Sequence, residues 1–154
     1  KVPGTDGQKM SKSYQNTIDV FEDPGVQKKK IMRITTDSRP LEEPKEPEED
    51  HLYQLFSLVA PQAERQALAD LYRRGGFGYG EVKKKLVEAA GQFFAEARAR
   101  RAELAADSAR VDAILAAGAA RARLKAGEVL ARARRACGLD RSAAPIVVTP
   151  GRQQ

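Results

Sequence analysis

The residues best suited to chemistry lie near the start of the chain, in the segment 4–14, which reads Gly-Thr-Asp-Gly-Gln-Lys-Met-Ser-Lys-Ser-Tyr. Two lysines, Lys9 and Lys12, stand three residues apart between small hydroxyl residues, and glycines precede them. Ammonium groups act as point charges on phosphate oxygens, hydroxyl and backbone N–H groups add hydrogen bonds, and glycines let a loop change shape. This pattern is typical of a flexible cationic loop that wraps a polyphosphate and stabilises charge on a leaving pyrophosphate. Composition alone fits an exposed Lys/Ser linker equally well.

Other reactive residue types are scarce. The chain has one cysteine, Cys137, and one histidine, His51, so it can form neither an internal disulfide nor the four-ligand set of a structural zinc site. His51 stands at the start of an amphipathic pattern beside an acidic run, where we expect a surface residue and not a catalytic one. No run approaches the roughly 18 uninterrupted apolar residues of a membrane-spanning helix. We therefore expect no metal site built by this chain alone and no membrane partner.

The chain of 154 residues carries a formal net charge of +6, but the charge is unevenly distributed. Residues 1–50 hold nine Lys and Arg against eleven Asp and Glu, whereas residues 51–154 hold eighteen against ten. A basic body of this kind suits a phosphate-rich partner, because lysine and arginine contacts release counterions from nucleic acid. A solvated basic surface without a partner explains the same numbers.

The elements that must position these residues are helices, because period-2 alternation is nearly absent. Asp23 precedes a proline and can cap a first helix, and Asp107 or Ser108 can cap the last one. The glycine run 75–80 follows no strand and lacks dinucleotide-fingerprint spacing, so a turn between helices is expected. The expected helices span about 23–35, 52–60, 63–74, 82–104 and 108–137.

These helices predict an all-α fold, with a helical bundle from Asp50 onward. The segment 41–50 mixes prolines with like charges and has almost nothing to bury, so we expect a mobile acidic loop there. The apolar stripes predict which side chains fill the core. The expected core contains Leu86, Phe93, Ile114, Leu115 and Leu130.

The string Lys9-Met10-Ser11-Lys12-Ser13 matches the KMSKS signature of class I aminoacyl-tRNA synthetases at all five positions. Its surroundings narrow the resemblance to one branch of that class. From residue 3 to about residue 139, the sequence resembles the C-terminal part of a tryptophanyl-tRNA synthetase. Tyrosyl-tRNA synthetase is the second candidate, because it often departs from KMSKS at the middle positions and usually ends in a different appended domain. The supporting matches are residues 4–8, Asn16-Thr17-Ile18, Lys29-Lys30-Ile31, Thr36-Asp37, Gly118-Ala119, Ala122, Ala126 and Gly138-Leu139.

The resemblance implies the chemistry of an ATP-dependent ligase. Members of the family have a Rossmann-type catalytic domain that binds ATP and tryptophan, forms an aminoacyl-adenylate with release of pyrophosphate, and passes the amino acid to tRNA(Trp). By position in the motif, Lys9 and Lys12 stabilise the transition state, and Met10, Ser11 and Ser13 complete the loop over the ATP phosphates. Mg²⁺ accompanies ATP, held mainly by the phosphates. The resemblance also implies a cytoplasmic enzyme that is a homodimer when full length.

The family's helical C-terminal domain recognises the tRNA anticodon, which agrees with the basic bias after residue 50. Arg121, Lys125 and Arg132 fall on one side of the last expected helix and can form a cationic ridge for tRNA phosphates. A solvated helix face is the alternative. Phe77 and Tyr79 are candidates for stacking on an unpaired base, although packing over the end of the bundle is the expected use.

We therefore expect four parts: residues 1–40 as the KMSKS loop and a following helix at the end of a catalytic domain, 41–50 as the acidic loop, 51–139 as a helical tRNA-binding domain, and 140–154 as an irregular tail. The family's HIGH-type sequence and its Rossmann strands are missing. We thus expect the C-terminal part of a longer protein, inactive alone and with the loop 4–14 poorly anchored. A non-catalytic basic helical RNA-binding module, in which the Lys/Ser segment is a linker, is the other hypothesis.

Overall fold

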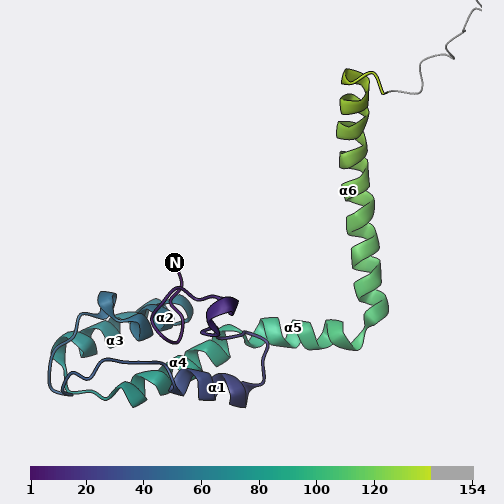
Figure 1. The fold of residues 1–154 in the computed structure, drawn as a ribbon. Helices are drawn as coiled ribbons and strands as arrows, with labels where there is room; N and C mark the ends of the chain where they lie inside the picture. The colour runs from purple at the N-terminus through teal and green to yellow at the C-terminus, as the bar shows by residue number, and fades with distance from the viewer. Residues whose placement is uncertain (140–154) are drawn as a thin grey trace, which may run out of the picture. The chain divides into compact units, whose positions relative to one another are not determined.

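The computed structural model describes residues 1–139, which form helices joined by turns and by longer irregular segments (Figure 1). Within these residues the only β contact is an isolated antiparallel bridge between Pro3 and Lys9, so the predicted all-α fold is confirmed. The predicted irregular tail, residues 140–154, lies outside the described residues. The elements in chain order are η1 (Lys12–Tyr14), α1 (Pro24–Met32), η2 (Pro47–Glu49), α2 (His51–Val59), α3 (Gln62–Arg74), α4 (Tyr79–Phe93), α5 (Ala95–Ala106) and α6 (Ser108–Ala136).

The described chain divides into two units, of which the first is residues 1–103 and the second begins at residue 104. The first unit contains η1 through α4 and most of α5, and the second contains α6. Across the described residues 1–139, no helix is both long enough and apolar enough to cross a membrane.

Capping side chains determine where three of the helices begin. The carboxylate of Asp23 accepts hydrogen bonds from two backbone N–H groups in the first turn of α1, at 2.8 and 3.2 Å, and a proline follows it. Asp50 caps α2 in the same way, and Asp107 caps α6. Each carboxylate satisfies N–H groups that have no acceptor within their own helix. The predicted caps at Asp23 and Asp107 are confirmed, whereas α1 ends at Met32, earlier than predicted.

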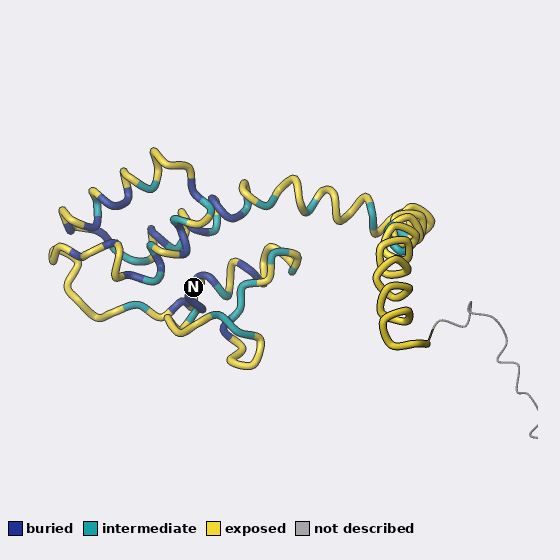
Figure 2. Tube along the Cα trace, turned by 90° about the horizontal axis from the view of Figure 1, so that it is seen from above, coloured by how far each residue is buried: buried dark blue, intermediate teal, exposed yellow. Residues whose placement is uncertain are grey.

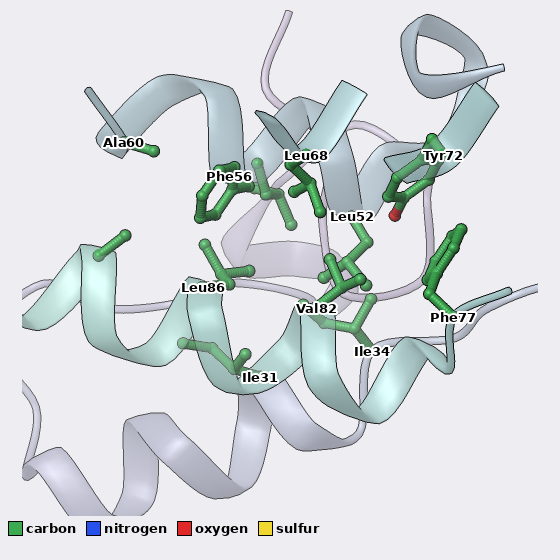
Figure 3. Packing of buried hydrophobic residues seen from close by; sticks show 12 residues of the cluster. Ile31, Ile34, Leu52, Phe56, Ala60, Leu68, Tyr72, Phe77, Val82 and Leu86 are labelled. Carbon is green, nitrogen blue, oxygen red and sulfur yellow. The ribbon is translucent and has the colours of Figure 1, made fainter. Parts of the chain in front are cut away.

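The core of the first unit forms where α4 packs against α1 and α2. Figure 3 shows Val82 and Leu86 on the side of α4 that faces Leu52 and Phe56 of α2, with Ile31 of α1 close by. These five side chains are at most 3% exposed. Full burial of each such side chain contributes about 1.5–3 kcal/mol relative to exposure. The prediction that Leu86 belongs to the core is confirmed.

The other four predicted core residues are exposed, so that part of the prediction is wrong. Phe93, the last residue of α4, is 58% exposed, and Ile114, Leu115 and Leu130 on α6 are 49–65% exposed. The helix α6 does carry the predicted apolar stripe. Within residues 104–139, however, no second element packs on that stripe, and the helix is exposed along nearly its whole length (Figure 2). Periodicity predicts an apolar face but does not predict what covers it.

The acidic segment 41–50 is packed against the first unit, so the prediction that it has almost nothing to bury is wrong. Lys45 is 2% exposed, and its ammonium donates hydrogen bonds to the carbonyls of Pro40 at 2.9 Å and Glu43 at 3.0 Å. The same ammonium lies 4.9 Å from the centre of the Phe77 ring. Carbonyl oxygens and an aromatic face replace the water that a buried ammonium loses.

The glycine run after α3 is a turn between helices, as predicted, and the acidic segment 41–50 packs against it. Gly75 has φ +75°, and a Cβ placed on it would lie 2.4 Å from the carbonyl oxygen of Glu42, so glycine is required there. The N–H of Gly76 donates to the Leu41 carbonyl at 2.8 Å. Phe77 is 3% exposed, so it packs within the fold and is not available for base stacking.

The single helix expected over 82–104 is two helices, α4 and α5, separated at Phe94. Arg98 connects α5 to the segment before α1. Its Nε donates to the Val20 carbonyl at 2.9 Å, and its Nη2 donates to the Gln27 side-chain oxygen at 2.7 Å. Gln27 is itself buried, and its Nε2 donates to the Asp19 carbonyl at 2.8 Å.

Candidate functional site

The segment 1–10 folds back on itself to form the first half of the cationic loop. The N–H of Met10 donates to the Val2 carbonyl at 2.9 Å, and the N–H of Gly4 donates to the Gln8 carbonyl at 2.7 Å. Gly7 occupies the turn with φ +79°, a conformation that favours glycine. These backbone bonds set the direction in which the next side chains project.

The next side chains divide between the body of the first unit and the solvent. Met10 is half-buried and packs against the hydrophobic core, whereas Lys9 before it is exposed. Ser11 is half-buried and precedes the single turn η1, which begins at Lys12 and leaves Lys12 and Ser13 exposed. The Met10 anchor therefore turns both lysines of the predicted site outward on the same short segment.

Asn16 lies at the centre of this loop and is 2% exposed. Its Oδ1 accepts a hydrogen bond from the Ser11 N–H at 2.8 Å. Its Nδ2 donates to the Lys9 carbonyl at 3.1 Å and to the Asp6 carboxylate at 2.8 Å. One amide side chain thus ties together three positions of the loop.

Backbone bonds attach the loop to the rest of the first unit. The N–H of Thr5 donates to the Asn16 carbonyl at 3.0 Å, and the N–H of Thr35, just beyond α1, donates to the Thr5 carbonyl at 2.9 Å. The prediction that the loop is poorly anchored is therefore wrong for its first half. Sequence spacing does not reveal these bonds, because the amide of Asn16 and the N–H of Thr35 reach the loop only in the folded chain.

The charged groups of the loop differ in their partners, because its one carboxylate is hydrogen-bonded within the loop and its two lysines are not paired within the described chain. The hydrogen bond from Asn16 holds the pKa of Asp6 below its ordinary value of 3.8; desolvation opposes this shift, and the Gln8 N–H adds to it. Within residues 1–139, neither Lys9 nor Lys12 forms an ion pair. Both ammonium groups are available to an anionic ligand.

His51 contacts the loop from the start of α2, which sequence reasoning missed. It is half-buried, and a Cβ placed on Gly7 would lie 3.4 Å from its Nδ1. Its Nε2 is buried without a hydrogen-bond partner among the protein atoms of the described chain. The histidine therefore packs beside the turn at Gly7.

The predicted tRNA-binding residues Arg121, Lys125 and Arg132 all lie on α6 in the second unit, and all three are exposed. Lys125 forms an ion pair with Glu128 at 3.1 Å, with both side chains well exposed. Exposed pairs of this kind contribute about 0–1 kcal/mol and exchange readily for another anion. Across residues 1–139, no group of three or more His, Cys, Asp or Glu side chains could hold a metal ion.

Comparison with known families decides what kind of loop this is. The family described as tRNA synthetases class I (W and Y) matches residues 1–95, more than half of the chain and all of the loop. The chain belongs to this family of class I tRNA synthetases. Its KMSKS loop therefore stands in the family's own sequence context, and the linker interpretation is not favoured.

Two similar relatives of this class I synthetase chain are both named for tryptophan. Tryptophan–tRNA ligase of Rhodopirellula baltica is 58% identical over 139 residues, which cover 90% of this chain and 43% of the relative. The ligase of the same name from Fusobacterium nucleatum is 43% identical over 140 residues, covering 90% of this chain and 42% of the relative. The resemblance to tryptophanyl-tRNA synthetase is confirmed, and the tyrosyl candidate is not favoured.

Solved structures agree with the sequence matches. Tryptophanyl-tRNA synthetase from Campylobacter jejuni, complexed with ADP and tryptophan, superposes with a TM-score of 0.79 at 40% identity. The match covers 90% of this chain and 43% of that chain. A second structure of the Campylobacter jejuni enzyme gives a TM-score of 0.77 over the same shares. The chain therefore spans less than half the length of the relatives that it matches.

Proposed function

We propose that the chain is part of a tryptophan–tRNA ligase and that the segment 4–14 is its ATP-phosphate loop. The observation that carries the proposal is the outward projection of Lys9 and Lys12 from a backbone held by Met10 and Asn16. The names of the relatives support tryptophan as the amino acid. The ADP complex of a structural neighbour supports a nucleotide as the other substrate.

In the proposed reaction, the carboxylate of tryptophan attacks the α-phosphorus of ATP, the bond to the bridging oxygen breaks, and pyrophosphate leaves. Negative charge grows on the leaving oxygens, where the ammonium groups of Lys9 and Lys12 stabilise it. The hydroxyls of Ser11 and Ser13 donate further hydrogen bonds. The phosphates themselves hold the accompanying Mg²⁺.

Replacement of the lysines in a full-length protein that carries this segment tests the proposal. Lys9→Ala and Lys12→Ala should each lower the rate of tryptophan-dependent ATP–pyrophosphate exchange by about 10²-fold or more. The affinity for ATP should change much less, because contacts strongest in the transition state act on the rate. Lys28→Ala, which removes an exposed lysine from α1, is the matched control. Equal losses in rate and affinity would contradict the assigned role, and exchange with tyrosine in place of tryptophan would restore the tyrosyl alternative.

We further propose that residues 51–139 bind tRNA(Trp), with Arg121, Lys125 and Arg132 contacting its phosphates, and that residues 1–40 complete the catalytic part. The exposure of all three cationic side chains on α6 supports this role. After activation, the amino acid passes from the adenylate to the tRNA terminus. The proposal also includes a homodimeric enzyme acting in the cytoplasm. Retained tRNA binding by a full-length protein without any pyrophosphate exchange would instead favour the non-catalytic RNA-binding module.

A further inference from the structure

Asn16 stands outside the five KMSKS letters, yet its side chain bonds to the backbone on both sides of Met10. It accepts from the Ser11 N–H and donates to the Lys9 carbonyl, so it bridges the residues that flank the half-buried Met10. The residue after Ser11 is Lys12, the first of η1. The two amide contacts therefore fix the stretch of backbone that separates the two ammonium-bearing side chains.

We infer that Asn16 is a positioning residue of the phosphate loop, which holds Lys9 and Lys12 at the spacing that the leaving pyrophosphate requires. The inference rests on the proposed function. Lysine side chains are long and flexible, so their charges converge on one anion only if their backbone attachment points are fixed. Preorganised donors stabilise a transition state because no reorganisation is needed as charge develops.

A second observation shows that the loop is built around this amide. Gly4 is buried, and a Cβ placed on it would lie 2.2 Å from Nδ2 and 2.4 Å from Cγ of Asn16. Position 4 therefore has no room for a side chain while Asn16 keeps its hydrogen bonds. Gly4→Ala should displace the amide without altering Asn16 itself or either lysine.

The kinetic signature of a positioning residue separates it from a residue that only stabilises the fold. In the full-length protein, Asn16→Ala should lower kcat for pyrophosphate exchange by about 10- to 100-fold, with KM for ATP changed by less than about threefold. Combined with Lys9→Ala and Lys12→Ala together, it should add little, because a displaced backbone cannot misplace charges that are already absent. Losses that multiply in this triple variant would overturn the inference.

Two further variants keep the test decisive if Asn16→Ala folds poorly. Asn16→Asp keeps the shape and the acceptor for Ser11 but loses the donor to Asp6 and Lys9, so kcat should fall. Adding Asp6→Asn restores a hydrogen bond between positions 6 and 16, because the new amide N–H at position 6 can donate to the carboxylate at position 16. This second substitution should recover part of the lost kcat. Gln27→Ala is the matched control, since it removes another buried amide with a backbone partner, from a residue outside the segment 4–14. It should lower the melting temperature while kcat stays within about twofold.

The outcomes distinguish this inference from the proposed function on which it rests. If Lys12→Ala leaves exchange unchanged, the role of the loop is wrong, whatever Asn16 does. If Lys12→Ala impairs exchange but Asn16→Ala and Gly4→Ala do not, the proposed function stands and the positioning role is wrong. If Gln27→Ala lowers kcat as much as Asn16→Ala does, the effect of Asn16 is one of general stability, and the inference is likewise wrong.

Discussion

The hydroxyl of Tyr79 donates a hydrogen bond to the carboxylate of Asp37 at 2.8 Å, across 42 positions of sequence. This bond joins the first residue of α4 to the connection that follows α1. Arg39 forms an ion pair with the same carboxylate. Desolvation is the main cause that raises the pKa of Tyr79, and the hydrogen bond to Asp37 raises it further. The phenol therefore stays protonated, and able to donate, to a higher pH than an unperturbed tyrosine.

Tyr79→Phe should lower the free energy of unfolding by about 1 kcal/mol, the usual net value of one hydrogen bond. The ring and its packing against Phe77 are retained, so the loss isolates the hydroxyl. Urea denaturation measures the change. Tyr14→Phe removes a hydroxyl from a ring that is 65% exposed and should have no measurable effect. Equal effects of the two substitutions would mean that the bond to Asp37 does not contribute.

Leu86→Ala should destabilise the first unit by about 2–5 kcal/mol, because it opens a cavity between helices that leave Leu86 only 3% exposed. Phe93→Ala, although it removes more atoms, should cost less than about 0.5 kcal/mol, since Phe93 is mostly exposed. Thermal melts of both variants give the comparison. A larger loss for Phe93 would show that its ring is covered in the complete protein.

Two glycines in the first unit should respond to alanine in opposite directions. Gly75→Ala should destabilise the fold by more than about 1 kcal/mol, since it combines a positive φ with a clash on the Glu42 carbonyl. Gly91 lies inside α4 and meets nothing within 4 Å, so Gly91→Ala should stabilise the helix by about 0.5–1 kcal/mol. Denaturant midpoints measure the change in stability of each variant. If Gly75→Ala stabilised the fold as Gly91→Ala is expected to do, the assigned backbone constraint at Gly75 would be wrong.

Asp6 should make the loop sensitive to acid in a defined direction. Its pKa is lower in the folded protein than the ordinary value of 3.8, so its contribution is fully present above that value and is lost as the pH falls through the lower folded value. A carbon-13 titration of the carboxyl group should show the depressed pKa. In Asn16→Ala the pKa should rise, because the hydrogen bond that lowers it most is removed. An unchanged titration would show that the amide does not bind the carboxylate in solution.

The cationic side of α6 should give a salt-dependent contribution to tRNA binding. Replacing Arg121 and Lys125 by Glu should weaken binding to cognate and non-cognate tRNA alike, since phosphate contacts position the RNA without reading its sequence. The dependence of affinity on salt should also become less steep. Anisotropy titrations at two salt concentrations measure both effects. Unchanged binding at low salt would leave α6 as a solvated helix.

Local chemistry made part of this structure predictable. A carboxylate followed by a helical pattern was enough to place the caps at Asp23 and Asp107, and the five-letter motif was enough to find the loop. Lys45 and Asn16 could not be recognised as buried, because their partners come from backbone groups that only the folded chain brings within reach. The apolar stripe on α6 was predicted correctly, but the prediction that it lies in the core was wrong. Periodicity shows which face of a helix is apolar and does not show whether another element packs on that face.

The burial of Lys45 divides the lysines of the first unit into two chemical classes. An amine-reactive acylating reagent reaches the exposed Lys9 and Lys12 in the native protein, so their labelling reports directly on whether an anion covers them. Lys45 is 2% exposed and bonded to two carbonyls, and it becomes reactive only when the surrounding structure opens. Mass-spectrometric labelling kinetics of one sample thus follow ligand protection at the loop and opening of the core as separate rates.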